Sequence, residues 1–140
     1  MQIHALIVDD SGIMRKMVMR SLTESRLAQF TFTEAVDGLD ALEKFDPKTT
    51  DMAFVDWNMP NMCGLDFIKE LRKTEKRHVP TVMITTEGTM GKVGEALDDA
   101  GVDGYIVKPF TVEVLIKKLE PLFAKMTKST GFFGKLATIS

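Results

Sequence analysis

Five short apolar segments alternate along the chain with longer amphipathic stretches. The apolar segments are Ile3–Val8, Phe30–Ala35, Asp51–Asp56, Thr81–Thr85 and Gly104–Val107. They are rich in Val, Ile, Phe and Thr, the residues that favour β-strands. The first, third and fourth contain continuous apolar runs, as strands buried on both faces do. We therefore predict five strands, of which these three are covered on both sides.

The amphipathic stretches carry apolar residues at helical spacing. The stripes are Ile13, Met17 and Leu22, then Leu39 and Leu42, then Leu65, Ile68 and Leu71, then Val93 and Leu97, and finally Val114, Leu115, Leu119 and Leu122. Strict alternation of five strands with five helices predicts an α/β fold, a doubly wound parallel sheet with right-handed crossovers and helices on both faces. In such sheets ligands bind beyond the carboxyl ends of the strands.

Length and composition restrict the class of protein. The 140 residues fit one domain, which we place at residues 1–126, followed by a tail at residues 127–140. The 18 basic and 20 acidic residues give a net charge of −2, which argues against a dedicated nucleic-acid binder. The single cysteine, Cys63, cannot form an internal disulfide, and no apolar run approaches the ~20 residues that span a bilayer. We expect a cytoplasmic protein that binds no membrane.

A group of basic residues lies on the third predicted helix. It consists of Lys69, Arg72, Lys73, Lys76 and Arg77. Glu70 and Glu75 interrupt the group, as acidic residues do on a solvated helix face. We therefore predict a solvated face here and no nucleic-acid site.

Polar side chains stand where the predicted strands end. They are Asp9 and Asp10 after the first strand, Asp56 at the end of the third, Thr85 at the end of the fourth and Lys108 after the fifth. In a parallel sheet these positions meet at one edge, where clustered carboxylates repel one another unless a cation joins them. Oxygen ligands alone favour a hard ion such as Mg²⁺, with Mn²⁺ as the alternative.

Each of these residues has an ordinary explanation when it is taken alone. An Asp pair after a strand is most often a helix cap, a threonine is a good strand residue, and Lys-Pro is usually a loop. The combination is more specific, because carboxylates, a hydroxyl and an ammonium around one spot suit a phosphorylated carboxylate.

The residues at the strand ends resemble the receiver domain of two-component response regulators. The matching positions are Asp9, Asp10, Asp56, Thr85, Lys108 and Pro109. The segment DWNMPNMCGLD, residues 56–66, is similar to the chemotaxis branch of that family. The resemblance covers residues 1–126 and leaves out the tail. It implies a flavodoxin-like sheet with strand order 2-1-3-4-5.

The resemblance implies roles for the acidic residues. Asp56 is expected to accept a phosphoryl group from a histidine kinase or a small phosphodonor, forming an acyl phosphate. Asp10 and Asp56 are expected to bind Mg²⁺ directly and Asp9 mainly through a water, while Asn58 contributes its backbone carbonyl. The ion neutralises charge on the transferring group and orients it.

The other matching residues are expected to hold the phosphoryl group or to respond to it. Lys108 is expected to pair with one phosphoryl oxygen, and Thr85 to hydrogen-bond another. Tyr105 matches an aromatic that turns inward on activation; without the family, a strand-edge tyrosine with a solvated hydroxyl is the simpler interpretation. Pro109 matches a proline that follows a cis peptide bond.

Two further positions, Asn58 and Glu87, match residues that tune how readily water removes the phosphoryl group. Their types resemble those of family members with a short-lived signal. The chain departs from the family at Thr86, where a small residue is usual, so access to Asp56 is expected to be narrower. Glycines at positions 88, 91 and 94 each cost a helix interior about 0.5–1 kcal/mol, so the fourth helix should begin late or fray.

The resemblance also implies partners. With no second domain, output is expected to come from binding a partner through the surface of the fourth helix, fifth strand and fifth helix, roughly residues 90–125. A chemotaxis histidine kinase would act upstream, the flagellar motor switch would receive the signal, and a dedicated phosphatase could end it. We expect a monomer that is a signalling phosphoacceptor and not an enzyme, assisting only its own phosphorylation and dephosphorylation.

Three other functions share features with this sequence. The nearest is a single-domain phosphorelay or cell-cycle regulator acting on a histidine-phosphotransfer protein. A haloacid-dehalogenase-type phosphatase needs a second acid two residues beyond its nucleophile, where Asn58 cannot protonate a leaving group. A flavin carrier of the same fold would place the acidic Asp9 and Asp10 against the flavin phosphate.

The tail carries apolar residues at helical spacing, which predicts a short amphipathic helix. They are Phe132, Phe133, Leu136 and Ile139. Such a helix either packs back on the domain or docks on a partner, and disorder is the third alternative.

Overall fold

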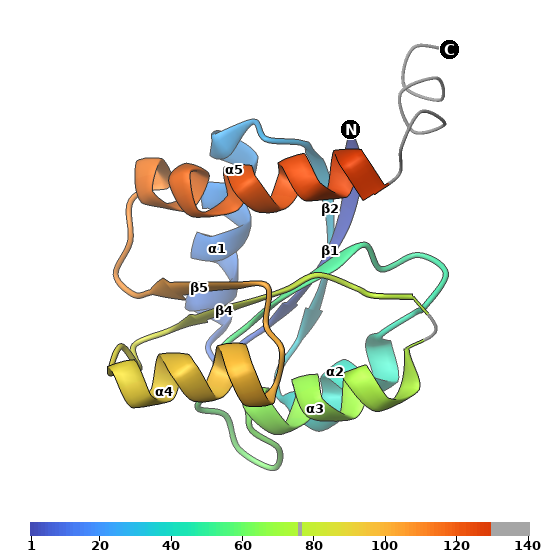
Figure 1. The fold of residues 1–140 in the computed structure, drawn as a ribbon, viewed down its shortest axis with the longest axis vertical. Helices are drawn as coiled ribbons and strands as arrows, with labels where there is room; N and C mark the ends of the chain where they lie inside the picture. The colour runs from blue at the N-terminus through green and yellow to red at the C-terminus, as the bar shows by residue number, and fades with distance from the viewer. Residues whose placement is uncertain (76, 130–140) are drawn as a thin grey trace.

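The predicted alternation of strands and helices is confirmed by a computed structural model, which describes residues 1–75 and 77–129 (Figure 1). The elements are β1 (Gln2–Val8), α1 (Gly12–Ser25), β2 (Gln29–Ala35), α2 (Gly38–Lys44), β3 (Met52–Val55), α3 (Gly64–Thr74), β4 (Thr81–Thr85), α4 (Met90–Gly94), the π-helical segment η1 (Glu95–Asp99), β5 (Gly104–Val107) and α5 (Val112–Ser129). Helix α5 thus runs on through Ser129. Of the predicted tail, residues 130–140 lie outside the described residues.

The five strands form one sheet in the order β2-β1-β3-β4-β5, and every neighbouring pair is parallel. This is the order that the family resemblance implied. Strands β1 and β3 are adjacent, with Val8 opposite Val55. The hydrogen bond from the Asp56 amide to the Val8 carbonyl, at 2.9 Å, continues this pairing past the end of β3. The residues that follow these two strands therefore start from neighbouring positions.

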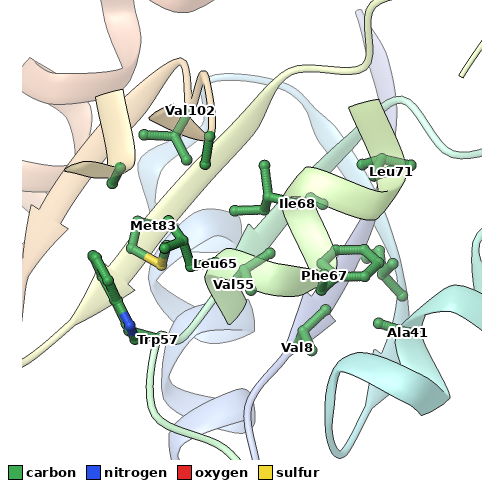
Figure 2. Close-up of a cluster of buried hydrophobic side chains, with 14 of the residues drawn as sticks. Val8, Ala41, Val55, Trp57, Leu65, Phe67, Ile68, Leu71, Met83 and Val102 are labelled. Atoms are coloured by element: carbon green, nitrogen blue, oxygen red, sulfur yellow. The ribbon is translucent and has the colours of Figure 1, made fainter. Parts of the chain in front are cut away.

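Helices cover both faces of the sheet, α1 and α5 on one side and α2, α3 and α4 on the other (Figure 1). Because successive strand residues point to opposite faces, β1 supplies both cores. Ile7 packs in a first cluster with residues of α1 and α5, whereas Val8 packs in a second cluster with residues of α3 on the opposite face. Figure 2 shows that second cluster, in which Leu65 and Ile68 of α3 lie against strand residues.

Hydrogen-bonded caps fix the start of three helices at the carboxyl edge of the sheet. The side chains of Ser11, Asp37 and Thr89 accept hydrogen bonds from backbone amides of the first turns of α1, α2 and α4. Such caps satisfy amides that have no partner within the helix. The fourth helix begins only at Met90, whereas β4 ends at Thr85, and it changes to π-helical hydrogen bonding at Glu95.

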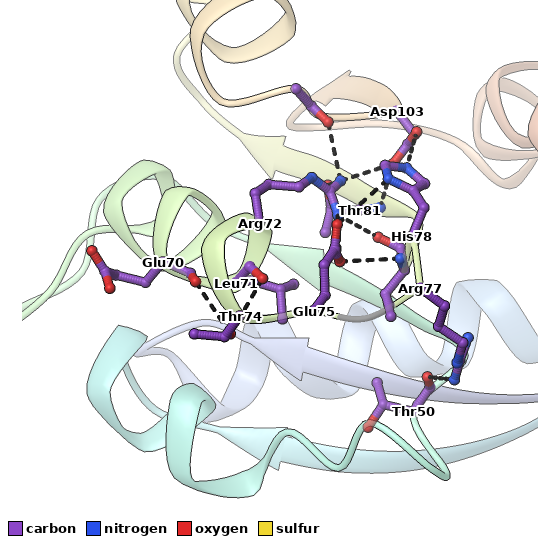
Figure 3. Close-up of polar contacts among 12 residues, drawn as sticks. Thr50, Glu70, Leu71, Arg72, Thr74, Glu75, Arg77, His78, Thr81 and Asp103 are labelled. Carbon is purple, nitrogen blue, oxygen red and sulfur yellow. Dashed lines mark hydrogen bonds and ion pairs between the residues drawn. The ribbon is translucent and has the colours of Figure 1, made fainter.

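The prediction of a solvated basic face on α3 is wrong for Arg72. Its guanidinium donates to both carboxylate oxygens of Glu75, each at 3.0 Å, and its side chain is 18% exposed. It also donates to the Thr81 hydroxyl at 2.8 Å and to Asp103 at 3.1 Å (Figure 3). Arg72 therefore joins α3 to the starts of β4 and β5, because its fork of donors reaches several acceptors at once.

Arg77 is exposed, as predicted, but it does not lie on α3. It lies beyond the end of α3 and donates to the Thr50 carbonyl at 2.8 Å (Figure 3). Lys73 does lie on an exposed helix face, paired with Glu70 at 3.0 Å. Lys76 lies outside the described residues. A sequence shows the charge of such residues but not the carbonyls that the fold brings to them.

Candidate functional site

Three carboxylates meet at the carboxyl edge of the sheet, as predicted. Asp9, Asp10 and Asp56 each offer an oxygen, and these atoms all lie within 4.8 Å of one another. Asp9 is buried, Asp56 is half-buried and Asp10 is exposed. Among the described residues, the Asp10 carboxylate has no hydrogen-bond or ion-pair partner. An oxygen-only donor set with a free carboxylate fits Mg²⁺, which binds through one or two carboxylates and keeps waters.

Lys108 reaches into this cluster from the end of β5. Its ammonium lies 3.0 Å from Oδ2 of Asp9 and 3.6 Å from Oδ2 of Asp56. The Lys108–Pro109 peptide bond is cis, as the resemblance implied, and the Lys108 amide donates to the Thr85 carbonyl at 2.8 Å. With 9% of its side chain exposed, Lys108 places a positive charge where an anion bound to Asp56 would need it.

The pKa of Asp56 is raised above its ordinary value, chiefly because burial penalises the carboxylate. A hydrogen bond with the Thr85 side chain and the charge of Lys108 oppose that shift, and the charge of Asp9 adds to it. One oxygen of Asp56 also accepts a hydrogen bond from the Trp57 amide at 2.8 Å. Because the Asp56 carboxylate is partly desolvated, a cation that binds beside it would stabilise its ionised form.

Thr85, Glu87 and Tyr105 are connected through the loop that follows β4. Thr85 is fully buried, and its hydroxyl oxygen accepts a hydrogen bond from the Glu87 amide at 3.4 Å. The Tyr105 hydroxyl donates to the Glu87 carbonyl. Tyr105 therefore points inward, with 9% of its surface exposed, and is not a strand-edge tyrosine with a solvated hydroxyl. Burial raises the pKa of Tyr105, so the phenol stays a neutral donor at physiological pH.

The two residues predicted to tune the lifetime, Asn58 and Glu87, are in direct contact. The Asn58 amide donates to the Glu87 carboxylate at 3.0 Å, and this bond joins the loops after β3 and β4. The sequence indicated both positions separately but not that they touch. The proposed ligand role of the Asn58 carbonyl stays a prediction, as does the narrowing of access by the exposed Thr86.

Backbone contacts that the sequence did not indicate hold the loop after Asp56. The Gly64 amide donates to the Trp57 carbonyl at 2.8 Å. A Cβ atom on Gly64 would lie 2.0 Å from the Asp56 carbonyl oxygen, so only glycine fits there. Asn61 has a positive φ of 67° and donates to the capping residue Asp37 at 2.7 Å. These close contacts form only in the folded chain, and no local sequence pattern predicts them.

Comparison with known proteins agrees with this geometry. Residues 5–120 match the model of the response regulator receiver domain. The chain is 47% identical over 117 residues to chemotaxis protein CheY1 of Helicobacter pylori, covering 82% of this chain and 92% of that protein. It is 41% identical over 123 residues to chemotaxis protein CheY of Pseudomonas aeruginosa, covering 86% and 96%.

Solved structures give the same picture. CheY4 of Vibrio cholerae, crystallised at low pH, superposes with a TM-score of 0.73 at 34% identity and covers 86% of this chain and 98% of that one. A CheX–CheY–BeF3–Mg complex from Borrelia burgdorferi gives a TM-score of 0.77 at 26% identity, covering 86% and 89%. In the described part of the chain, no helix has the length and apolar character needed to cross a membrane. The chain belongs to the response regulator receiver domain family, and its relatives named above are chemotaxis proteins.

Proposed function

We propose that this chain is a stand-alone response regulator of chemotaxis that accepts a phosphoryl group on Asp56 in a Mg²⁺-dependent reaction. The observation that carries the proposal is the meeting of three carboxylates with the Lys108 ammonium at one edge of the sheet. Asp56 has the Lys108 ammonium 3.6 Å from its Oδ2, and a hydrogen bond with the Thr85 side chain counteracts the rise of its pKa.

Phosphoryl transfer to Asp56 requires little proton transfer by the protein. An oxygen of Asp56 forms a bond to phosphorus while the bond from phosphorus to the donor breaks. The imidazole nitrogen of a phosphohistidine, or the acetate of acetyl phosphate, leaves with that electron pair. Lys108 pairs with one phosphoryl oxygen and Thr85 donates to another, which stabilises the charge of the transferring group. Asp10 and Asp56 would hold Mg²⁺ directly and Asp9 indirectly, and the ion would supply further neutralisation of the phosphoryl charge.

The signal is a population shift that begins at Thr85. A phosphoryl oxygen competes for the Thr85 hydroxyl. In the structure this hydroxyl hydrogen-bonds with Asp56 and accepts a hydrogen bond from the Glu87 amide. Glu87 in turn holds the Tyr105 hydroxyl, so a change at Thr85 reaches β5 through one residue. The surface of α4, β5 and α5 then presents itself differently to partners.

The relatives, which are named as chemotaxis proteins, support the partners that we propose. A chemotaxis-type histidine kinase supplies the phosphoryl group, and the flagellar motor switch binds the phosphorylated form in the cytoplasm. The Borrelia structure pairs a CheY with CheX, which favours a phosphatase as a third partner. The chain itself is a monomeric phosphoacceptor, and it is not an enzyme acting on a separate substrate.

Two experiments test this proposal. Intact-mass spectrometry after incubation with acetyl phosphate and MgCl₂ should show one added phosphoryl group, absent in Asp56→Asn and absent with EDTA. Immobilised motor-switch peptides should then retain the phosphorylated chain better than the unmodified chain. Retention by histidine-phosphotransfer domains instead would favour a phosphorelay regulator.

A further inference from the structure

Arg15, in the first turn of α1, lies beside the acidic cluster without belonging to it. One guanidinium nitrogen, Nη1, donates to the backbone carbonyl of Asp9 at 2.7 Å. Its Nε donates to the Glu34 carboxylate at 2.9 Å. With only 15% of its side chain exposed, Arg15 therefore links the end of β1 to the end of β2.

The Asp9 carbonyl and the Asp10 amide share one planar peptide unit. A donor that is held on that carbonyl therefore fixes the orientation of the peptide plane between Asp9 and Asp10, and with it the position of the Asp10 backbone. This matters for Asp10 because its own carboxylate has no partner among the described residues. Asp9, by contrast, is also held by its side chain, which accepts from the Ser11 amide at 2.9 Å and from Lys108 at 3.0 Å.

The charge of Arg15 would by itself oppose a cation at the cluster, but Glu34 neutralises it at contact distance. The Arg15–Glu34 pair can thus hold the Asp9 carbonyl with a rigid guanidinium donor while repelling a bound cation only weakly. A lysine could not do this, because its single ammonium on a flexible stem cannot hold the same two acceptors in a fixed plane.

We propose that Arg15, neutralised by Glu34, is a positioning residue that orients Asp10 for cation binding. This inference rests on the Mg²⁺ site of the proposed function. Groups behind the direct ligands typically contribute about 10–100-fold to metal affinity, and we expect roughly tenfold weaker Mg²⁺ binding in Arg15→Lys.

Calorimetric titration with MgCl₂ alone tests this without any phosphorylation. Arg20→Lys is the matched control, because Arg20 pairs with Glu24 on the exposed face of the same helix. The second readout is the ¹H–¹⁵N resonance of the Asp10 amide in metal-free protein, which should move in Arg15→Lys and stay in place in Arg20→Lys. A stability change alone would move neither the Mg²⁺ affinity nor that single resonance selectively.

Unchanged Mg²⁺ affinity in a folded Arg15→Lys variant would overturn the proposal. If that variant does not fold, Glu34→Gln decides, because it leaves Arg15 unneutralised and should weaken Mg²⁺ binding most at low salt. Equal affinity of Glu34→Gln and the unmodified chain at low salt would also overturn it. Absence of Mg²⁺ binding to the unmodified chain would instead contradict the proposed function itself.

Discussion

The side-chain amide of Asn58 donates a hydrogen bond to the carboxylate of Glu87 at 3.0 Å. Asn58 lies in the loop after β3 and Glu87 in the loop after β4, so the contact joins these two loops. The Glu87 backbone also contacts Thr85 and Tyr105. The residues expected to control the lifetime of the phosphoryl group are thus physically connected to those expected to transmit its presence.

Because Asn58 and Glu87 share one hydrogen bond, their effects on the phosphoryl lifetime should not be independent. We expect Asn58→Met and Glu87→Arg each to change the rate at which radiolabelled phosphoryl is lost from Asp56. The double variant should differ from the product of the two single effects. Multiplicative effects would show that the residues act separately, and unchanged lifetimes in both single variants would remove them from this role.

The raised pKa of Asp56 predicts a pH-dependent gain in stability for Asp56→Asn. A carboxyl with a folded pKa above its unfolded value favours the folded state only while it is protonated, so its ionisation lowers stability as the pH rises through both values. Asn removes that cost, and the variant should be the more stable at about pH 7.

The advantage should shrink as the pH falls below the folded pKa, and it should vanish only below about pH 3, where the carboxyl is protonated in both states. Urea unfolding of both proteins across this range measures the difference. An advantage that is constant with pH, or that grows toward acid, would contradict the assigned direction of the pKa.

Gly64 and Gly91 form a matched pair for the cost of a side chain. A Cβ at Gly64 meets the Asp56 carbonyl oxygen, whereas a Cβ at Gly91 meets no atom within 4 Å. Gly64→Ala should therefore destabilise the fold by about 1–3 kcal/mol or more, and Gly91→Ala should stabilise it by about 0.5–1 kcal/mol. Chemical denaturation gives both values, and equal effects of the two substitutions would refute this account of the loop.

Arg72 and Lys73 are neighbours in sequence with very different surroundings. Arg72→Met leaves Glu75 and Asp103 without their guanidinium partner and should cost about 2–3 kcal/mol, since partly buried carboxylates lose charged hydrogen bonds. Lys73→Met removes one exposed ion pair and should cost less than about 1 kcal/mol. Similar free energies of unfolding for the two variants would show that the Arg72 contacts contribute nothing.

Periodicity was enough to predict all five strands, because each is a short segment rich in strand-favouring residues between amphipathic helical stretches. The strand order needed the family resemblance, since alternation alone does not say which strands are neighbours. Once the strands were predicted to be parallel, the cluster of Asp9, Asp10 and Asp56 could be predicted, because these residues follow strand ends at the same edge of the sheet.

The errors have a common physical origin. Arg72 has the charge of a solvated residue, yet folding brings a carbonyl and a carboxylate to it from other elements. Arg15 and Gly64 gave no local signal either, because their importance depends on what lies next to them in space. Sequence patterns record which face a residue occupies better than which partner it meets.

The most direct test of the account uses Trp57, whose amide donates to Asp56 and whose ring lies 4.8 Å from the Lys92 ammonium. Trp57 is the only tryptophan, so its fluorescence reports one position. Emission would be followed as MgCl₂ and then acetyl phosphate are added, with Asp56→Asn in parallel. We predict a change at each addition, with the second absent in Asp56→Asn. A folded protein that responds to neither addition, or an Asp56→Asn variant that responds fully to acetyl phosphate, would contradict phosphorylation at Asp56.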